Sequence, residues 1–281
     1  SISPRTREKI ASAADKLGYK PNIIARSLSK RQSRLIGLLF SNWTHPKAAD
    51  LLKKITEVLT EHNYKVIVQS ATGDRDADAA LHDFLQYQVD GVIVFSATPS
   101  PEVSTEYARD QVPIVILNRP RTVQTTSSVS VDGTDIGEQI AGALMARPYK
   151  RLSLISADQH SPIVNGMMDA IVNATASHPD VQITSRLTGI DGYEAGKHVI
   201  NEIWQGGGIT PDAIVCTSDN TALGILAGCR QHLNIQVPTE LAIVGLGDVT
   251  VAAWKDHNLT TVKIPHDEMV AKAVEILLER I

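Results

Sequence analysis

The sequence predicts an α/β fold of two parallel β-sheets, each covered by helices on both faces. Short apolar runs recur along residues 35–281 and alternate with longer helical patterns, which is typical of parallel sheets. The first run, LIGLLF at residues 35–40, contains no polar residue, as expected for a strand buried on both faces. The alternation occurs twice, with a break near Arg147–Pro148. This repetition indicates two similar lobes.

The expected elements follow from local patterns, because runs of Val, Ile and Leu mark strands and an apolar period of 3.6 residues marks helices. In the first half we expect strands at 35–40, 66–69, 91–95, 114–117 and 128–131, and helices at 48–62, 76–88, 101–109 and 134–145. In the second half we expect strands at 152–156, 182–187, 213–216, 241–244 and 259–264, and helices at 163–176, 194–204, 221–233, 251–254 and 266–280. Ligands bind beyond the carboxyl ends of parallel strands, so the expected site is a cleft between the lobes.

The first 34 residues differ from the rest in charge. They hold nine Lys and Arg against two acidic residues, or +7, whereas the remaining 18 basic and 29 acidic residues give −11. Ser3-Pro4 predicts the start of a helix that runs to Leu17, and Pro21 predicts a second, short helix to Leu28 that needs a partner to be stable. A basic arm on an acidic body indicates contact with nucleic-acid phosphates, although a solvated charged tail fits the charge alone equally well.

Several classes of function find no support in the sequence. Cys216 and Cys229 fall at a strand end and inside a helix, a placement that predicts neither a disulfide nor a cysteine metal site. The nine histidines follow no metal-binding spacing, and Gly206–Gly208 follows a helix, so it is no phosphate loop. No apolar run could cross a bilayer, and the first residues do not have the pattern of a signal peptide, so we expect no export. We therefore expect a cytoplasmic protein without a cofactor, metal or catalytic centre.

Seven segments, taken together, resemble the lactose/galactose-repressor (LacI/GalR) family of bacterial transcription regulators. They are SPRTREKIASAADKLGYKPNIIARSLSKRQSRLIGLLF at 3–40, VDGVIVF at 89–95, VPIVILNRP at 112–120, SVSVDG at 128–133, CTSDNTALG at 216–224, VPTELAIVGLGD at 237–248 and LTTVKIP at 259–265. Their joint order and spacing make the resemblance specific over nearly the whole chain. It implies a periplasmic-binding-protein-like, effector-binding domain at 35–281. Lobe 1 would take about 35–146 and 265–281, and lobe 2 about 147–264.

The resemblance also implies a role for the basic arm. Residues 1–20 would be the remnant of a DNA-binding headpiece, matching its third helix, and the helix-turn-helix proper would lie outside this sequence. Residues 21–34 would form a hinge helix and linker that enters the minor groove of operator DNA. The matching DNA contacts are Asn22, Ala25, Arg26 and Leu28, with Leu28 as an apolar wedge between base steps.

The family also forms homodimers through its first lobes. The matching surface here includes the helix at 48–62. Its apolar residues are Leu51, Leu52, Ile55 and Leu59, some of which are also expected to pack on the sheet.

The expected effector site departs from the family pattern at three places. Lys47 and Ala48 stand where aromatic residues are frequent, Ile163 stands where an arginine is common, and Gly247 replaces an acidic residue that is displaced to Asp248. Effector recognition must therefore differ from that of the usual sugar-binding relatives. The candidate contacts from the matching loops are Asn42, Trp43, His45, Asp132, Asp158, His160, Asn165, Asp191, Tyr193, Asp219, Asp248 and Trp254.

The leading functional hypothesis is a transcription regulator, a repressor whose operator affinity is set by a sugar or sugar derivative. The alternative is a solute-binding protein for a carbohydrate transporter, which would have an export signal and no basic hinge. An enzyme that uses cleft carboxylates is a third class, for which the residue spacing offers no support. Induction and co-repression both stay open, as do dimer and tetramer.

Overall fold

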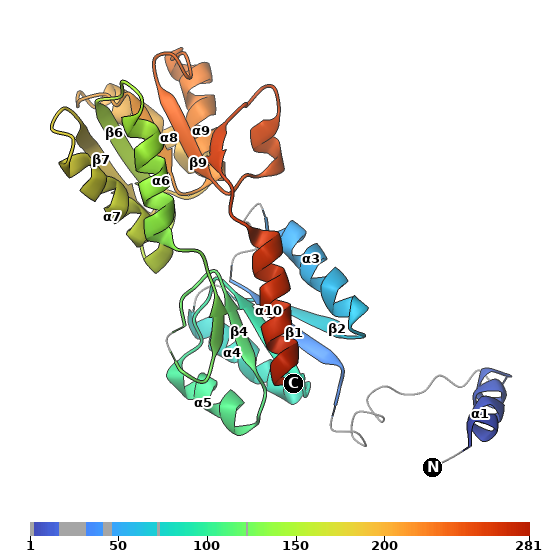
Figure 1. Ribbon diagram of the computed structural model, residues 1–281. Coiled ribbons are helices and arrows are strands. Elements are labelled where there is room, and N and C mark those ends of the chain that lie inside the picture. The colour runs from blue at the N-terminus through green and yellow to red at the C-terminus, as the bar shows by residue number, and fades with distance from the viewer. Residues whose placement is uncertain (1–2, 17–31, 42–46, 72–73, 122) are drawn as a thin grey trace.

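The computed structural model describes residues 3–16, 32–41, 47–71, 74–121 and 123–281. Helix α1, Pro4–Lys16, begins where the sequence predicts it, because the Ser3 hydroxyl accepts the Thr6 N–H at 3.3 Å. The body consists of two lobes, each built on a five-stranded parallel sheet (Figure 1). The predicted fold class is therefore confirmed.

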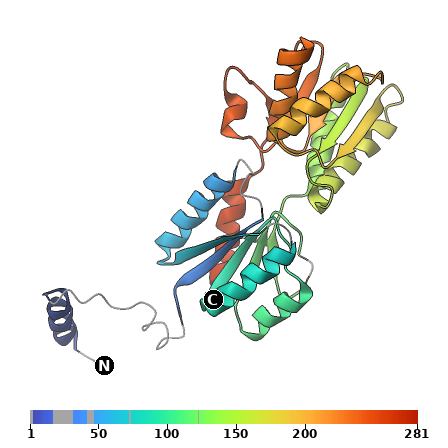
Figure 2. The ribbon, with the colours of Figure 1, turned by 180° about the vertical axis from the view of Figure 1, so that it is seen from behind.

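Lobe 1 is a sheet with the strand order β2-β1-β3-β4-β5. Its strands are β1 (Leu35–Phe40), β2 (Lys65–Ser70), β3 (Gly91–Phe95), β4 (Ile114–Leu117) and β5 (Ser127–Val129). Its helices are α3 (Ala48–Glu61), α4 (Asp74–Gln86), α5 (Pro101–Arg109) and α10 (His266–Arg280). Helices α3 and α10 cover one face of the sheet, and α4 and α5 cover the other (Figure 2).

Lobe 2 repeats this plan with the strand order β10-β9-β8-β6-β7. Its strands are β6 (Arg151–Ser156), β7 (Gln182–Thr188), β8 (Ala213–Cys216), β9 (Ala242–Leu246) and β10 (Thr260–Val262). Its helices are α6 (Gly133–Met145), α7 (Pro162–Ala176), α8 (Tyr193–Gln205) and α9 (Asp219–Gly228), with a π-helical turn η1 (Cys229–Leu233) and a 3₁₀ turn η2 (Thr250–Ala253). Helices α6 and α7 lie on one face, and α8 and α9 on the other. Cys216 and Cys229 are buried, free thiols.

Helix α6 belongs to lobe 2, whereas the sequence places it in lobe 1 with a crossing at residues 146–147. Glycines explain this packing, because they let α6 approach α7 closely. A Cβ atom on Gly133 would lie 1.9 Å from the Ile163 carbonyl oxygen, and one on Gly137 would lie 2.3 Å from the Met167 carbonyl oxygen. The chain therefore changes lobe before α6. We propose lobe boundaries at residues 130–132 and 263–265.

The last helix returns to lobe 1, as the resemblance implies. The side chains of Met269, Val270, Ala273, Val274 and Leu277 are buried, and α10 packs against α3 and the strands β3, β4 and β5. Lobe 2 is thus an insertion between β5 and α10 of lobe 1.

Candidate functional site

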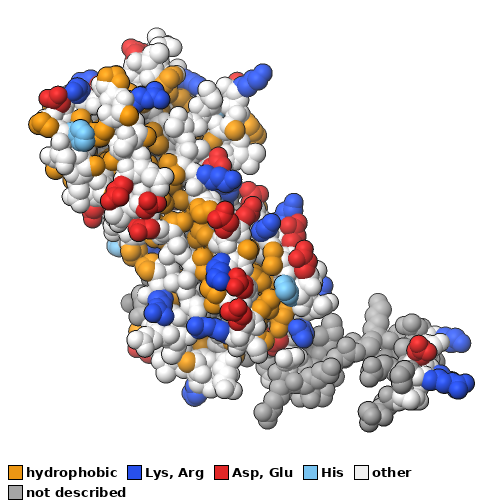
Figure 3. Space-filling view, viewed as in Figure 1, with side chains coloured by type: hydrophobic (Ala, Val, Ile, Leu, Met, Phe, Trp, Pro, Cys, Tyr) orange, Lys and Arg blue, Asp and Glu red, His pale blue; other side chains and the backbone are white. Residues whose placement is uncertain are grey.

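Two cavities lie where the lobes meet, at the carboxyl ends of the strands. The first has a volume of about 650 Å³ and is lined by Lys47, Asp50, Leu51 and Lys54 of lobe 1, Gly247 and Asp248 of lobe 2, and residues 263–268. The second, of about 380 Å³, is lined by Pro120, residues 130–134, Pro162, Ile163 and Gly166. Both volumes suit small molecules. Side chains of both charges lie over α3 and α10 beside the first cavity (Figure 3).

Four predicted site residues gather at or near the second cavity. Asp132 lines it and caps α6, since its Oδ1 accepts the Thr134 N–H at 2.8 Å. The other three, Asp158, His160 and Asn165, lie on or beside the loop between β6 and α7. The Asp158 carboxylate accepts the His160 N–H at 2.9 Å, and the Asn165 amide donates to the Gln159 carbonyl oxygen at 3.1 Å. These bonds fix the conformation of the loop.

Arg119 joins this loop from the opposite lobe and is absent from the predicted set. It follows β4 by two residues, and its guanidinium donates to the Asp158 carboxylate at 2.7 Å and to the His160 carbonyl oxygen at 3.1 Å. The Arg119 side chain is only 17% exposed. The Arg119 guanidinium therefore joins lobe 1 to lobe 2 through two hydrogen-bond acceptors. Its position just beyond a strand end is the sequence signal that could have identified it.

We expect Arg119→Ala to open the lobes. A partly buried, charge-assisted contact of this kind contributes about 1 kcal/mol, so the ratio of open to closed molecules should rise about fivefold. Distances between spin labels placed on α5 and α8 would measure the change. Arg109→Ala is the matched control, because Arg109 pairs with Glu106 and Asp110 inside lobe 1. An Arg119→Ala distance distribution identical to that of the wild type would contradict the expectation.

Asp219 is buried, and it does not line either cavity. Its side chain is 1% exposed, its Oδ2 accepts the Val249 N–H at 2.9 Å, and its Oδ1 accepts the Thr261 hydroxyl at 2.5 Å. Burial raises the pKa of Asp219 above its ordinary value, and the hydrogen bonds from Thr261 and Val249 partly offset this shift. The sequence places Asp219 among the direct effector contacts. The structure places it beneath the Gly247–Asp248 loop, where it shapes the wall of the first cavity.

Of the remaining predicted residues, one lies on this wall and three are exposed side chains of lobe 2. Asp248 lines the first cavity, and its N–H donates to the Thr261 hydroxyl at 3.2 Å. Trp254 is 56% exposed and stacks on the imidazole of His257, with ring centroids 6.1 Å apart. Asp191 and Tyr193 are exposed at the start of α8. Trp254, Asp191 and Tyr193 are not brought into either cavity.

The other predicted residues lie outside the described part of the chain. They are the cleft residues Asn42, Trp43 and His45 and the hinge residues Asn22, Ala25, Arg26 and Leu28. Among the residues that are described, no group of His, Cys, Asp and Glu could hold a metal ion. No helix within those same ranges has the length and apolar character that crossing a membrane requires.

Comparison with known proteins agrees with this architecture. Residues 33–281 match the family described as periplasmic binding proteins and sugar binding domain of LacI family. The chain belongs to this family.

Its relatives include catabolite control protein A from Staphylococcus epidermidis, which is 24% identical over 279 residues that cover 99% of this chain and 84% of that protein. The same protein from Priestia megaterium is 25% identical over 283 residues, with the same coverage. A LacI family transcriptional regulator from Lactobacillus casei, solved with bound glucose, shares the fold with a TM-score of 0.76 at 22% identity, over 88% of this chain and 93% of that one.

Proposed function

We propose that this chain is a DNA-binding transcription regulator, a repressor whose operator affinity is set by a sugar or sugar derivative held between the lobes. One observation carries the proposal. The similarity to catabolite control protein A covers 99% of the chain, and it therefore includes residues ahead of position 33, where the family match begins. Those residues hold the basic arm that a regulator needs and a transporter's binding protein lacks.

The two-lobe geometry supports a mechanism of closure. The basic arm joins lobe 1, and both cavities have walls from both lobes, so a ligand that contacts both walls stabilises the closed arrangement. A regulator of this kind needs an effector that binds the two states unequally, which typically corresponds to about 1–3 kcal/mol of coupling. Catalysis has no part in this proposal.

The effector class follows from the lining of the cavities. The first cavity combines lysines with carboxylates, and the second has Asp132, Ser130 and Thr134 beside apolar groups. Donors and acceptors in close alternation suit a ligand rich in hydroxyl groups. The glucose in the Lactobacillus casei regulator is of this chemical class.

The proposal includes a homodimer formed through lobe 1 in the cytoplasm. Leu51, Ile55 and Leu59 of α3 are buried against their own sheet, so they stabilise the lobe. A dimer contact on α3 would therefore use its solvent-exposed face, which includes Lys53 and Glu57, with the partly buried Leu52 and Val58 at the margins of the buried stripe.

A ligand screen followed by a DNA titration tests the proposal. The native protein should melt at a higher temperature with a sugar, sugar acid or sugar phosphate, because binding to the folded state stabilises it by mass action. The same ligand should change the affinity of the full-length protein for duplex DNA by about 5–150-fold. Tight sugar binding by a full-length protein that selects no duplex from a random library would favour the transporter alternative.

A further inference from the structure

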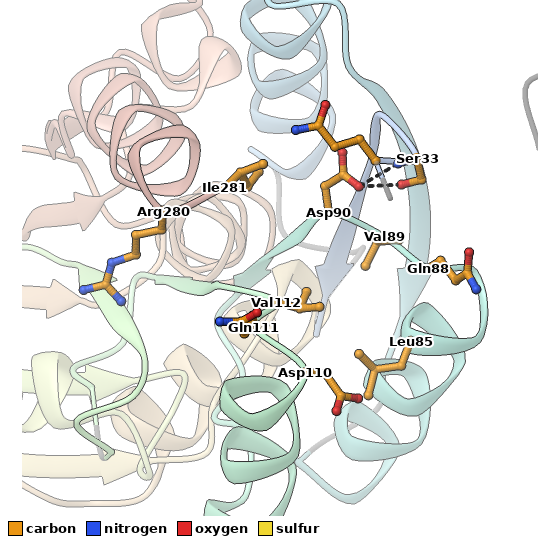
Figure 4. A pocket seen from close by; sticks show the side chains of 11 residues that line it. Ser33, Leu85, Gln88, Val89, Asp90, Asp110, Gln111, Val112, Arg280 and Ile281 are labelled. Atoms are coloured by element: carbon orange, nitrogen blue, oxygen red, sulfur yellow. Dashed lines mark hydrogen bonds between the residues drawn. The ribbon is translucent and has the colours of Figure 1, made fainter. Parts of the chain in front are cut away.

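The junction between the basic arm and lobe 1 lies at the edge of the sheet opposite the cavities between the lobes. Ser33 and Arg34 come directly before β1, and Asp90 comes directly before β3. The Asp90 Oδ1 accepts the Ser33 N–H at 2.8 Å and the Ser33 hydroxyl at 2.9 Å, as Figure 4 shows. The Asp90 Oδ2 accepts the Arg34 N–H at 3.0 Å. One carboxylate thus holds both residues that lead into the body.

The neighbouring strand β2 holds Arg34 from the other side. The Arg34 carbonyl oxygen accepts the N–H of Lys65, the first residue of β2, at 2.9 Å. Its guanidinium lies 5.0 Å from the centre of the Tyr64 ring, which is nearly fully buried. Arg34 also has a φ of 58°, in the left-handed region that costs a non-glycine residue about 1 kcal/mol or more. These contacts keep the chain in a bend that it would not adopt alone.

The strand behind Asp90 also reaches the lobe junction. At the far end of β3, the Ser96 carbonyl oxygen accepts the Ser41 hydroxyl at 2.8 Å, and the Ser96 hydroxyl accepts the Asn118 amide at 3.2 Å. Asn118 precedes Arg119, the residue that bridges the two lobes. One buried strand therefore lies between the cross-lobe contact and the Asp90 carboxylate.

We propose that Asp90 is a positioning residue that fixes the course on which the basic arm leaves lobe 1, and that this fixed course is required for tight DNA binding. The inference rests on the proposed function. Its physical reason is entropic. An arm released from Asp90 leaves the body in many directions, and DNA binding must then restrict it to one.

Amide hydrogen exchange tests the anchor without DNA. In Asp90→Ala the Ser33 and Arg34 amides should exchange at least about tenfold faster, because both lose their acceptor. Asp90→Asn should affect the two amides differently, because the carboxamide keeps an oxygen that accepts from Ser33 but presents an N–H₂ group, which cannot accept, to the Arg34 N–H. Only the Arg34 amide should then exchange faster. Asp110→Ala is the matched control, since Asp110 and Asp90 line one cavity at this edge of the sheet (Figure 4) and Asp110 pairs with Arg109.

DNA titration of the full-length protein tests the consequence. The probe is a duplex that the wild-type protein selects from a random-sequence library. Asp90→Ala should bind it about tenfold more weakly, Asp90→Asn should lie between, and Asp110→Ala should match the wild type. Sugar affinity should stay within about twofold in all three variants, which separates the effect from misfolding.

Two results would overturn the inference. If the Ser33 and Arg34 amides exchange at the wild-type rate in Asp90→Ala, Asp90 does not hold the start of the arm. Faster exchange with wild-type DNA affinity would show that the fixed course is not needed. A wild-type protein that selects no duplex would instead defeat the proposed function and the DNA requirement with it, and the exchange experiment would still decide the anchor.

Discussion

Asp219→Ala is expected to destabilise lobe 2 by about 3 kcal/mol, because it leaves the buried Val249 N–H and the Thr261 hydroxyl without their acceptor. For a lobe of this size the melting temperature should fall by roughly 6–12 °C. Differential scanning calorimetry would measure the loss. Asp191→Ala is the control, since that carboxylate is exposed in a nearby loop, and its effect should stay within about 0.5 kcal/mol.

Asp219→Asn should lower the free energy of unfolding far less than Asp219→Ala does, and it should change how that free energy depends on pH. Its carboxamide oxygen can accept the Val249 N–H, and its N–H₂ group can donate to the Thr261 hydroxyl oxygen. The folded-state pKa of Asp219 is raised, so between the ordinary carboxyl pKa and this raised value the folded protein binds a proton that the unfolded chain does not. In that window the wild type gains stability as the pH falls and loses it as the pH rises.

The Asn variant lacks this proton. The difference in unfolding free energy between wild type and Asp219→Asn should therefore move in favour of the Asn variant as the pH rises through the window. A difference that does not change with pH, or an Asn variant as unstable as Asp219→Ala, would contradict this account.

Gly137→Ala is expected to destabilise the protein by about 3 kcal/mol. The new Cβ atom would lie 2.3 Å from the Met167 carbonyl oxygen and 2.7 Å from the Ala170 Cβ, so α6 and α7 would have to separate. Because α6 also follows the crossing at 130–132, this separation would disturb the second cavity. Thermal or urea denaturation would give the magnitude.

Gly142→Ala, in the same helix, provides the matched comparison. Nothing lies within 4 Å of a Cβ atom at Gly142, so alanine should stabilise the helix by about 1 kcal/mol through its better helix propensity. The two substitutions should thus have opposite signs. If both substitutions stabilise the protein to the same extent, helix propensity rather than the α6–α7 approach governs Gly137.

The sheets could be predicted because a parallel strand buried on both faces is a short run of Val, Ile and Leu, as in β3. The lobe to which α6 belongs could not. Its apolar period shows that one face is buried, but it does not show against which sheet. The close approach of α6 to α7 at Gly133 and Gly137 decides that α6 packs in lobe 2. From sequence alone, a helical glycine needed for close packing cannot be told from one that the helix merely tolerates.

The candidate site divides in the same physical terms. The rule that ligands lie beyond strand ends points to Asp132 and Asp158, and the structure has both at the lobe junction. The same rule applies to Arg119, but sequence alone does not separate it from the exposed Arg121 two residues later. Nor does sequence distinguish Asp219, a buried carboxylate that holds a loop, from a carboxylate that faces a ligand. Each distinction depends on side-chain contacts between segments far apart in the chain.

The insertion of lobe 2 between β5 and α10 also sets an order of assembly. All the elements of lobe 2 are made consecutively, so its core can close as soon as β10 has left the ribosome. The α3 face of the lobe 1 sheet must wait for α10, a delay on the order of ten seconds at about 5–20 residues per second. Until then apolar side chains such as Val115 and Leu117 lack the cover that α10 provides. Lobe 1 begins first and finishes last, and the risk of aggregation during synthesis therefore falls on the lobe that carries the basic arm.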